Sequence, residues 1–276
     1  MYDASIGRWH TLDPLAEKYY SISPFTYCAD NPIIFVDPNG MQIDPASQDK
    51  WDEQKKAVTD RRDKLQSKVD KLTTKSAEKG WSADKLASKI GNMDERVASL
   101  NSSLNGLRTL ETSDQVYSIS KINSGEMGGM TLKDDVINIG YLNTANFVHE
   151  TTHAGQFERG EIAFLDGKTI GQDIFDEVGA YKAQFAYDPA SVSSLKSTSE
   201  ANSFAAITPI WLRGIQTSDG SYPYSIGGYA NTGNVRVDIN STKNTLLQAY
   251  PTAAQAFIGL RDNIKLKNIQ GIYYKK

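Results

Sequence analysis

The sequence predicts an α+β fold that is mainly helical and contains a small β-sheet. Residues 48–112 hold apolar side chains at helical spacing and contain no proline, whereas residues 113–143 hold short runs of alternating apolar and polar side chains. From residue 144 onward, loops rich in turn-forming residues separate stretches that again have helical spacing. We therefore expect a helical hairpin over residues 48–112, followed by a mixed domain over residues 113–276.

The hairpin is predicted from two apolar seams. The downstream seam alternates spacings of four and three residues, as one face of a helix does, and consists of Leu86, Ile90, Met93, Val97, Leu100, Leu104 and Leu107. The looser upstream seam consists of Trp51, Val58, Leu65, Val69 and Leu72. Gly80, which breaks a helix, and Ser82, which can cap one, lie between the seams. Two antiparallel helices that pack on the neighbouring domain follow most simply, because an oligomerising coiled coil would need a longer repeat.

β-Structure is predicted for residues 113–143. The stretches QVYSISKI and DVINIGYL each alternate β-branched and polar residues, and the turn-rich stretch NSGEMGG lies between them. Further along the chain, helices are expected over residues 144–159, 172–187, 201–215 and 243–263.

Composition and charge exclude several classes of protein. The chain has 276 residues, of which 39% are hydrophobic and 23% charged, as in ordinary soluble globular proteins. A net charge of −3 gives no electrostatic case for nucleic acid as the main partner. No run of about 18 apolar residues exists, so no transmembrane helix is expected, and the N-terminal stretch lacks the basic and apolar regions of a signal peptide. The single cysteine, Cys28, rules out an internal disulfide.

Two of the three histidines, His149 and His153, lie four residues apart in the stretch HETTH. On a helix, which Asn143 or Thr144 can cap, residues four apart share a face. The two imidazoles would then point at one place, as two ligands of a tetrahedral zinc require. Glu150 would reach the edge of the metal, where it can accept the proton of a water molecule that zinc acidifies. The motif predicts a zinc site with Glu150 as general base; two structural histidines are the alternative.

A catalytic zinc needs a third protein ligand and an open fourth position. His10 is the one remaining histidine, and it lies in a different region of the chain. The stretch 171–189 offers Asp173, Asp176 and Glu177 on a predicted helix that can pack against the first one. The residues alone leave all three carboxylates open as the third ligand.

The stretch HETTH is followed, 24 residues after its second histidine, by Glu177 in the stretch DEVGAYKAQ. This pattern resembles the gluzincin class of zinc metallopeptidases. The resemblance implies a zincin-like domain in which His149, His153 and Glu177 bind one zinc ion and Glu150 is the general base. The pattern of thermolysin, a member of this class, would place Asp at position 181, where this chain has Tyr181. The partner that orients a zinc ligand therefore stays open.

The predicted reaction also needs a hydrogen-bond donor opposite the metal, to stabilise a tetrahedral oxyanion. Candidates for this donor are Tyr181, Tyr187, Tyr224, Tyr229 and Arg213. The chain has 14 tyrosines, so most of them are expected to be packing residues. The stretch 134–142 is expected to be either an edge strand that pairs with an extended substrate or an internal strand. Residues 48–112 hold no cluster of metal-binding side chains and are expected to be dispensable for zinc binding.

The N-terminal stretch MYDASIGRWHTLDPLAEKYYSISPFTYCADNPIIFVDPNGM carries a second resemblance, to the end of the Rhs repeat-associated core. The family pattern runs Y-D-x-x-x-G-R-W/F, then D-P, S-P-Y-x-Y, N-P and a final D-P-x-G. The matching residues are Tyr2, Asp3, Gly7, Arg8, Trp9, Asp13, Pro14, Ser23, Pro24, Phe25, Tyr27, Asn31, Pro32, Asp37, Pro38 and Gly40. Asp13 and Asp37 resemble paired aspartates that carry out self-cleavage in this family, here after Met41; alternatively they make turns before proline. Residues 1–47 are expected to be a short remnant of this core.

Rhs proteins enclose a variable C-terminal toxin in a β-cage, so this resemblance implies that an effector follows Met41. Together the two resemblances imply a zinc-dependent metallopeptidase toxin that hydrolyses peptide bonds of a protein in a target cell. A bacterium would secrete or deliver it, and a cognate immunity protein would block it. The alternatives are a non-toxic processing peptidase and a binding or pore-forming toxin in which the histidines are structural.

Overall fold

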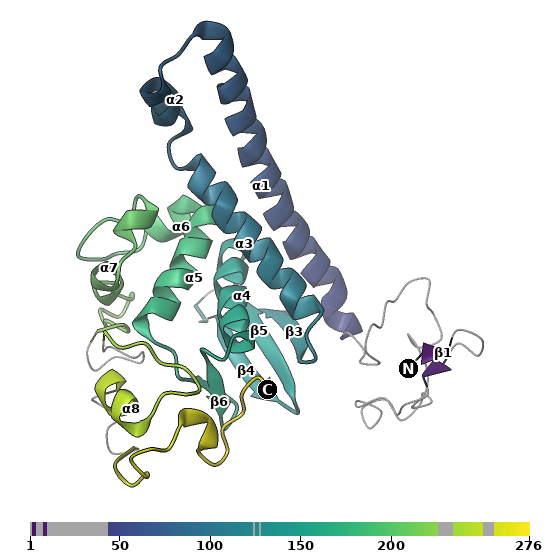
Figure 1. Cartoon of the computed structure of the whole chain (residues 1–276), viewed down its shortest axis with the longest axis vertical. Coiled ribbons are helices and arrows are strands. Elements are labelled where there is room, and N and C mark those ends of the chain that lie inside the picture. Colours follow the sequence, from purple (N-terminus) through teal and green to yellow (C-terminus); the bar gives the residue numbers. More distant parts are fainter. Residues whose placement is uncertain are drawn as a thin grey trace.

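The computed structural model describes residues 2–3, 8–9, 44–123, 125–126, 128–225, 234–250 and 257–276. Within these ranges the chain has the predicted α+β architecture, with several helices and a small mixed sheet (Figure 1). No helix in this part of the chain is both long enough and apolar enough to cross a membrane. The residues proposed for self-cleavage, Asp13, Asp37 and Met41, lie outside the described residues, as does Tyr229.

The elements have the following bounds. The helices are α1 (Pro45–Lys79), α2 (Ala83–Ile90), α3 (Met93–Glu111), α4 (Thr144–Glu158), α5 (Ile174–Tyr187), α6 (Pro189–Ser193), α7 (Pro209–Arg213) and α8 (Lys243–Ala249), with short 3-10 helices at η3 (Phe204–Ala206) and η5 (Leu266–Asn268). The strands are β1 (Tyr2–Asp3), β2 (Arg8–Trp9), β3 (Val116–Lys121), β4 (Gly129–Lys133), β5 (Val136–Tyr141), β6 (Ala163–Leu165) and β7 (Lys168–Ile170). The two-residue strands β1 and β2 pair with each other.

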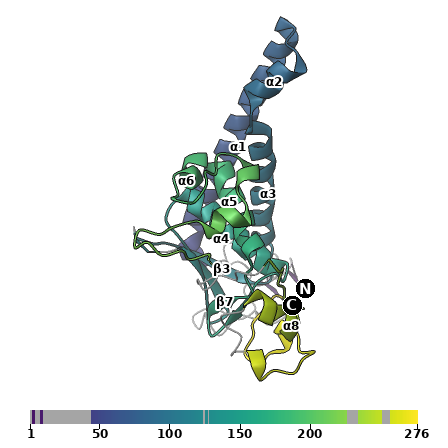
Figure 2. The ribbon, with the colours of Figure 1, turned by 90° about the vertical axis from the view of Figure 1, so that its left-hand side faces the viewer.

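Helices α1, α2 and α3 form an arm that projects from one end of the molecule (Figure 1, Figure 2). The long helix α1 ends at Gly80, whose φ of 58° is left-handed, and the side chain of Ser82 caps α2. The downstream seam was expected on one helix but is divided between α2 and α3. Gly91 has a φ of 56°, a conformation that an α-helix does not contain, so α2 ends before it and the chain turns at Asn92.

The base of the arm belongs to the main hydrophobic core. Val58 of α1 and Leu100 of α3 are completely buried in the same cluster as Phe147 of α4, and Trp51 meets Phe147 edge to face at 5.6 Å. Arg96 of α3 also donates a hydrogen bond to the carbonyl of Ala186, near the end of α5. Removing residues 48–112 would expose the core beneath α4, so we expect the remaining body to be less stable. That this segment is dispensable for zinc binding itself stays a prediction.

Because the base of the arm is buried in the core and α2 is not, a Leu→Ala substitution should destabilise the protein more at the base than in α2. Leu100→Ala at the base should lower the free energy of unfolding by about 2–5 kcal/mol, because it leaves a cavity in a closed core. Leu86→Ala in the half-buried face of α2 should lower it by less than about 1.5 kcal/mol. Urea unfolding followed by circular dichroism measures both values. A loss at Leu100 no larger than the loss at Leu86 would contradict this difference between the base of the arm and α2.

The sheet has the strand order β3-β5-β4-β7-β6 and places its apolar face toward the helices. Strands β3 and β5 are parallel, and β4 pairs antiparallel with β5. Ile137 and Ile139 of β5 are completely buried in the core cluster, whereas Asn138 between them binds serines of β3 on the other face. Because β5 lies between β3 and β4, the stretch 134–142 holds an internal strand, which is the second of the two alternatives expected from the sequence.

Two helices expected in the C-terminal part are shorter than predicted. The range 201–215 contains the short elements η3 and α7, separated at Thr208, because a residue before proline avoids the helical conformation. The range 243–263 begins with α8, which ends at Ala249. Tyr250 precedes Pro251 and has left the helical conformation, with φ −123° and ψ 64°.

Candidate metal centre

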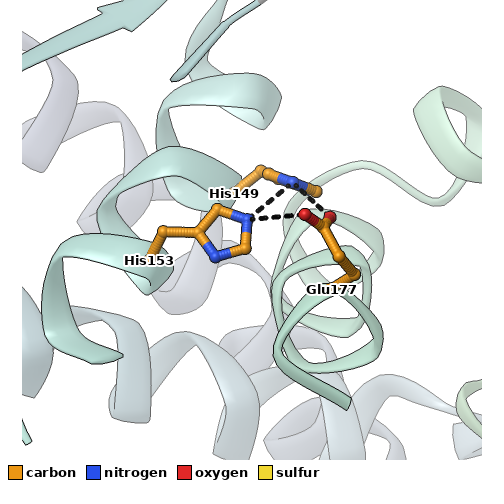
Figure 3. A group of neighbouring side chains, drawn as sticks. All are labelled: His149, His153 and Glu177. Atoms are coloured by element: carbon orange, nitrogen blue, oxygen red, sulfur yellow. Dashed lines mark hydrogen bonds and ion pairs between the residues drawn. The ribbon is translucent and has the colours of Figure 1, made fainter. Parts of the chain in front are cut away.

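Helix α4 carries the HETTH stretch into the interior of the protein. Asn143 caps the helix, its side chain accepting a hydrogen bond from the amide of Asn146. His149 and His153 point from the same face of α4, toward α5 (Figure 3). Both side chains are buried, with exposed fractions of 6% and 3%. A polar pair this deeply buried needs partners that compensate for the loss of water.

Helix α5 supplies the third side chain, Glu177. The two other carboxylates considered from the sequence have a different role, because Asp173 and Asp176 form a capping box at the start of α5. Asp173 accepts hydrogen bonds from the amides of Phe175 and Val237, and Asp176 accepts one from the amide of Asp173. Burial and the charge of Asp173 raise the pKa of Asp176 to about 7. Of the three candidates, Glu177 is the one that lies with the two histidines.

The three side chains converge on one point (Figure 3). The Nε2 atoms of His149 and His153 are 3.2 Å apart, and they lie 3.5 and 3.7 Å from the nearest Glu177 oxygens. Ligand atoms about 2.0–2.1 Å from a tetrahedral zinc are about 3.3–3.4 Å from one another. One ligand atom of each residue lies within 4.8 Å of the others, so this buried cluster can hold a metal ion.

The electrostatics of the cluster also suit a cation. Burial lowers the pKa of His153, but the Glu177 carboxylate, with Glu150 and Gln156, outweighs burial and raises it to about 9. Burial raises the pKa of Glu177, but His153 and His149 outweigh it and hold that pKa well below its usual range. The Oε2 atom of Glu177 is buried and accepts no hydrogen bond within the described residues. A metal ion would supply the positive charge that a protonated histidine supplies otherwise.

The residue that orients His153 is Gln156, one turn along α4. Its Oε1 atom lies 2.6 Å from Nδ1 of His153, and its amide nitrogen donates to the carbonyl of Asp176 at 3.0 Å. An amide oxygen can only accept, so Nδ1 of His153 carries a hydrogen, which leaves Nε2 as the ring atom that can bind a metal ion. Tyr181 meets the ring of His149 edge to face at 4.6 Å. Gln156 was not predicted from the sequence, although residues three apart on a helix, as Gln156 and His153 are, lie close enough for contact.

Two of the tyrosines named as hydrogen-bond donors lie together beside the cluster. The hydroxyl groups of Tyr181 and Tyr224 are 3.2 Å apart. Burial, and then the charge of Glu177, raise the pKa of both phenols well above its usual value, so both keep their protons at neutral pH. Tyr187 and Arg213 have other contacts. The side chain of Tyr187 packs against the main core, and Arg213 donates to Asn234.

The general-base candidate, Glu150, is also buried, with an exposed fraction of 6%. Its Oε1 atom accepts a hydrogen bond of 3.0 Å from the side chain of Asn146, one turn earlier on α4. The charge of Glu150 contributes to the raised pKa values of His153, Tyr181 and Tyr224, and Glu150 directly follows His149 on α4. Asn146 was not predicted from the sequence, although residues four apart on a helix, as Asn146 and Glu150 are, lie close enough for such a contact.

Comparisons with known proteins found no relative of this chain. No family model matches the chain, and no curated protein and no solved structure is significantly similar to it. The geometry and chemistry of this cluster therefore have to carry any functional conclusion.

Proposed function

We propose that the chain is a zinc-dependent endopeptidase. The observation that carries this proposal is the buried cluster of His149, His153 and Glu177, with the carboxylate of Glu150 on the same helix. Two imidazoles and one carboxylate are a donor set used by catalytic zinc sites, which have three protein ligands. The zincin-like fold and the single zinc ion per chain are part of the proposal.

The proposed reaction is hydrolysis of a peptide bond. Zinc would acidify a water molecule and polarise the carbonyl oxygen of the scissile bond. Glu150 accepts a proton from the attacking water and passes it to the amine that leaves, so that the carboxylate is restored after each turnover. Tyr181 and Tyr224 keep neutral hydroxyl groups that can donate to the developing oxyanion.

The biological setting that we propose comes from the N-terminal sequence. The resemblance of residues 1–41 to the end of the Rhs core supports an effector of a polymorphic toxin, secreted or delivered by a bacterium. Its substrate would be a protein of the target cell, and a cognate immunity protein would bind the effector and block it. Self-cleavage after Met41, by Asp13 and Asp37, belongs to the same proposal.

The enzymatic part is tested with purified protein and a generic unfolded substrate. Zinc-loaded protein should cleave casein, and a chelator of transition metals such as 1,10-phenanthroline should stop the cleavage. Added zinc should restore it, because a metal with three protein ligands can be withdrawn and replaced. Mass spectrometry of the fragments identifies the bonds that are cut. Cleavage that persists in chelator, or a zinc-loaded protein that cuts nothing, would contradict the proposal; the second outcome together with vesicle leakage would favour a pore-forming toxin.

A further inference from the structure

Asn146 is held between the backbone and the proposed general base. Its Oδ1 atom accepts a hydrogen bond of 2.9 Å from the amide of Leu142, and its Nδ2 atom donates one of 3.0 Å to Oε1 of Glu150. A backbone amide can only donate, so the Asn146 amide group has one possible orientation here, with its NH₂ toward the carboxylate. Leu142 lies between β5 and α4, so the end of the sheet fixes this side chain.

Gly128 lies against the same carboxylate oxygen of Glu150. A Cβ atom added at Gly128 would lie 2.4 Å from Oε1 of Glu150 and 2.7 Å from Oδ1 of Asn146, much closer than such atoms approach. Gly128 does not have the positive φ that excludes other residues, so glycine is needed here for space. The residue directly precedes β4, whose pairing with β5 places it.

We propose that Asn146 and Gly128 are positioning residues for Glu150. Asn146 binds Oε1 of the carboxylate, and the missing side chain at Gly128 leaves the space in which that oxygen lies. The second oxygen, Oε2, is then presented to the reacting water in one orientation. This inference rests on the proposed peptidase function, since it assigns the two residues to the base of that reaction. It makes β4 and the β5–α4 junction part of the catalytic architecture.

A misplaced base should lower the rate of the chemical step and leave the metal in place. Gly128→Ala should displace the Glu150 carboxylate, and Asn146→Ala and Asn146→Asp should release it, because neither replacement can donate to Oε1. A displacement of 1 Å can lower a rate about 100-fold, so we expect kcat to fall by about 10–100-fold with KM within about 2-fold. Zinc content should stay at that of the wild type, because neither residue is in the metal cluster.

Two control variants carry a Gly→Ala and an Asn→Asp substitution at positions away from Glu150. Gly155→Ala adds a methyl group on α4, where it meets only the end of the flexible Arg159 side chain, at 3.4 Å. Asn105→Asp makes the same amide-to-acid change on the exposed side of α3. Both controls should keep kcat, KM and zinc content.

The experiment combines crystal structures of zinc-loaded wild type, Gly128→Ala and Asn146→Ala with kinetics on a fluorogenic peptide that spans a bond cut in casein. A displaced Glu150 carboxylate in both variants, together with a loss confined to kcat, supports the proposal. A carboxylate that keeps its wild-type position, or a kcat that stays within about 2-fold, would overturn it. If the zinc-loaded wild type cuts no peptide, the peptidase function fails, and the crystal structures still decide whether the two residues position Glu150.

Discussion

Glu150→Gln is expected to abolish peptide hydrolysis while leaving the metal bound. Glutamine has nearly the size of glutamate and can still accept a hydrogen bond from Asn146, but it cannot accept the proton of the attacking water. General-base catalysis commonly contributes about 10²–10⁴-fold, so the rate of casein or peptide cleavage should fall by that factor. Zinc should remain at one ion per chain, since Glu150 is not one of the three clustered residues.

The control for this variant is Glu200→Gln, the same change on an exposed loop, which should keep both rate and zinc. Cleavage rates and metal content are measured on the same preparations. Loss of zinc in the Glu150→Gln variant would make Glu150 a ligand, and an unchanged rate would remove it from the reaction.

Glu177→Gln is expected to have the opposite effect, with the metal lost first. The substitution keeps the shape of the side chain but removes the negative charge that faces His149 and His153 at 3.5 and 3.7 Å. Loss of a partner that only orients a ligand weakens metal affinity about 10–100-fold, so loss of a ligand charge should weaken zinc binding more than about 100-fold. Competition with a chromophoric chelator measures the dissociation constant.

Asp176→Asn separates this role from that of its neighbour. Asp176 accepts a backbone hydrogen bond within the capping box, which asparagine can also accept, so zinc affinity should stay within about 10-fold of the wild type. A large loss in Asp176→Asn, or full affinity in Glu177→Gln, would show that the third ligand has been assigned to the wrong carboxylate.

The choice among the three carboxylates shows which parts of the site the sequence could predict. Helical periodicity alone allows Asp173, Asp176 or Glu177 to face α4. The spacing of Asp173 and Asp176 is that of a capping box, and this local rule would have assigned both to the start of α5. The contacts of Gly128 with Glu150 could not be predicted in this way. They depend on the tertiary packing of α4, which carries Glu150, against the start of β4.

The strands of the sheet, like the site, were predicted from the sequence only in part. Local sequence predicted β3 and β5, which alternate regularly, but β4, β6 and β7 were not predicted. Two of the missed connections are tight hairpin turns with positive φ at both central residues, at Asp134–Asp135 and Asp166–Gly167. The Asp-Gly pair is a strong hairpin signal, so β6 and β7 could have been found from the sequence. Their position at the far edge of the sheet is set by tertiary packing instead.

The central claim is that His149, His153 and Glu177 bind a catalytic zinc, and metal analysis of the purified protein tests it most directly. After incubation with zinc and removal of the unbound ion, mass spectrometry of the metals should find one zinc per wild-type chain. His149→Ala should lose most of that zinc, because two remaining ligands make a poor site. A wild-type protein that retains no zinc, or a His149→Ala variant that retains as much as the wild type, would contradict the account.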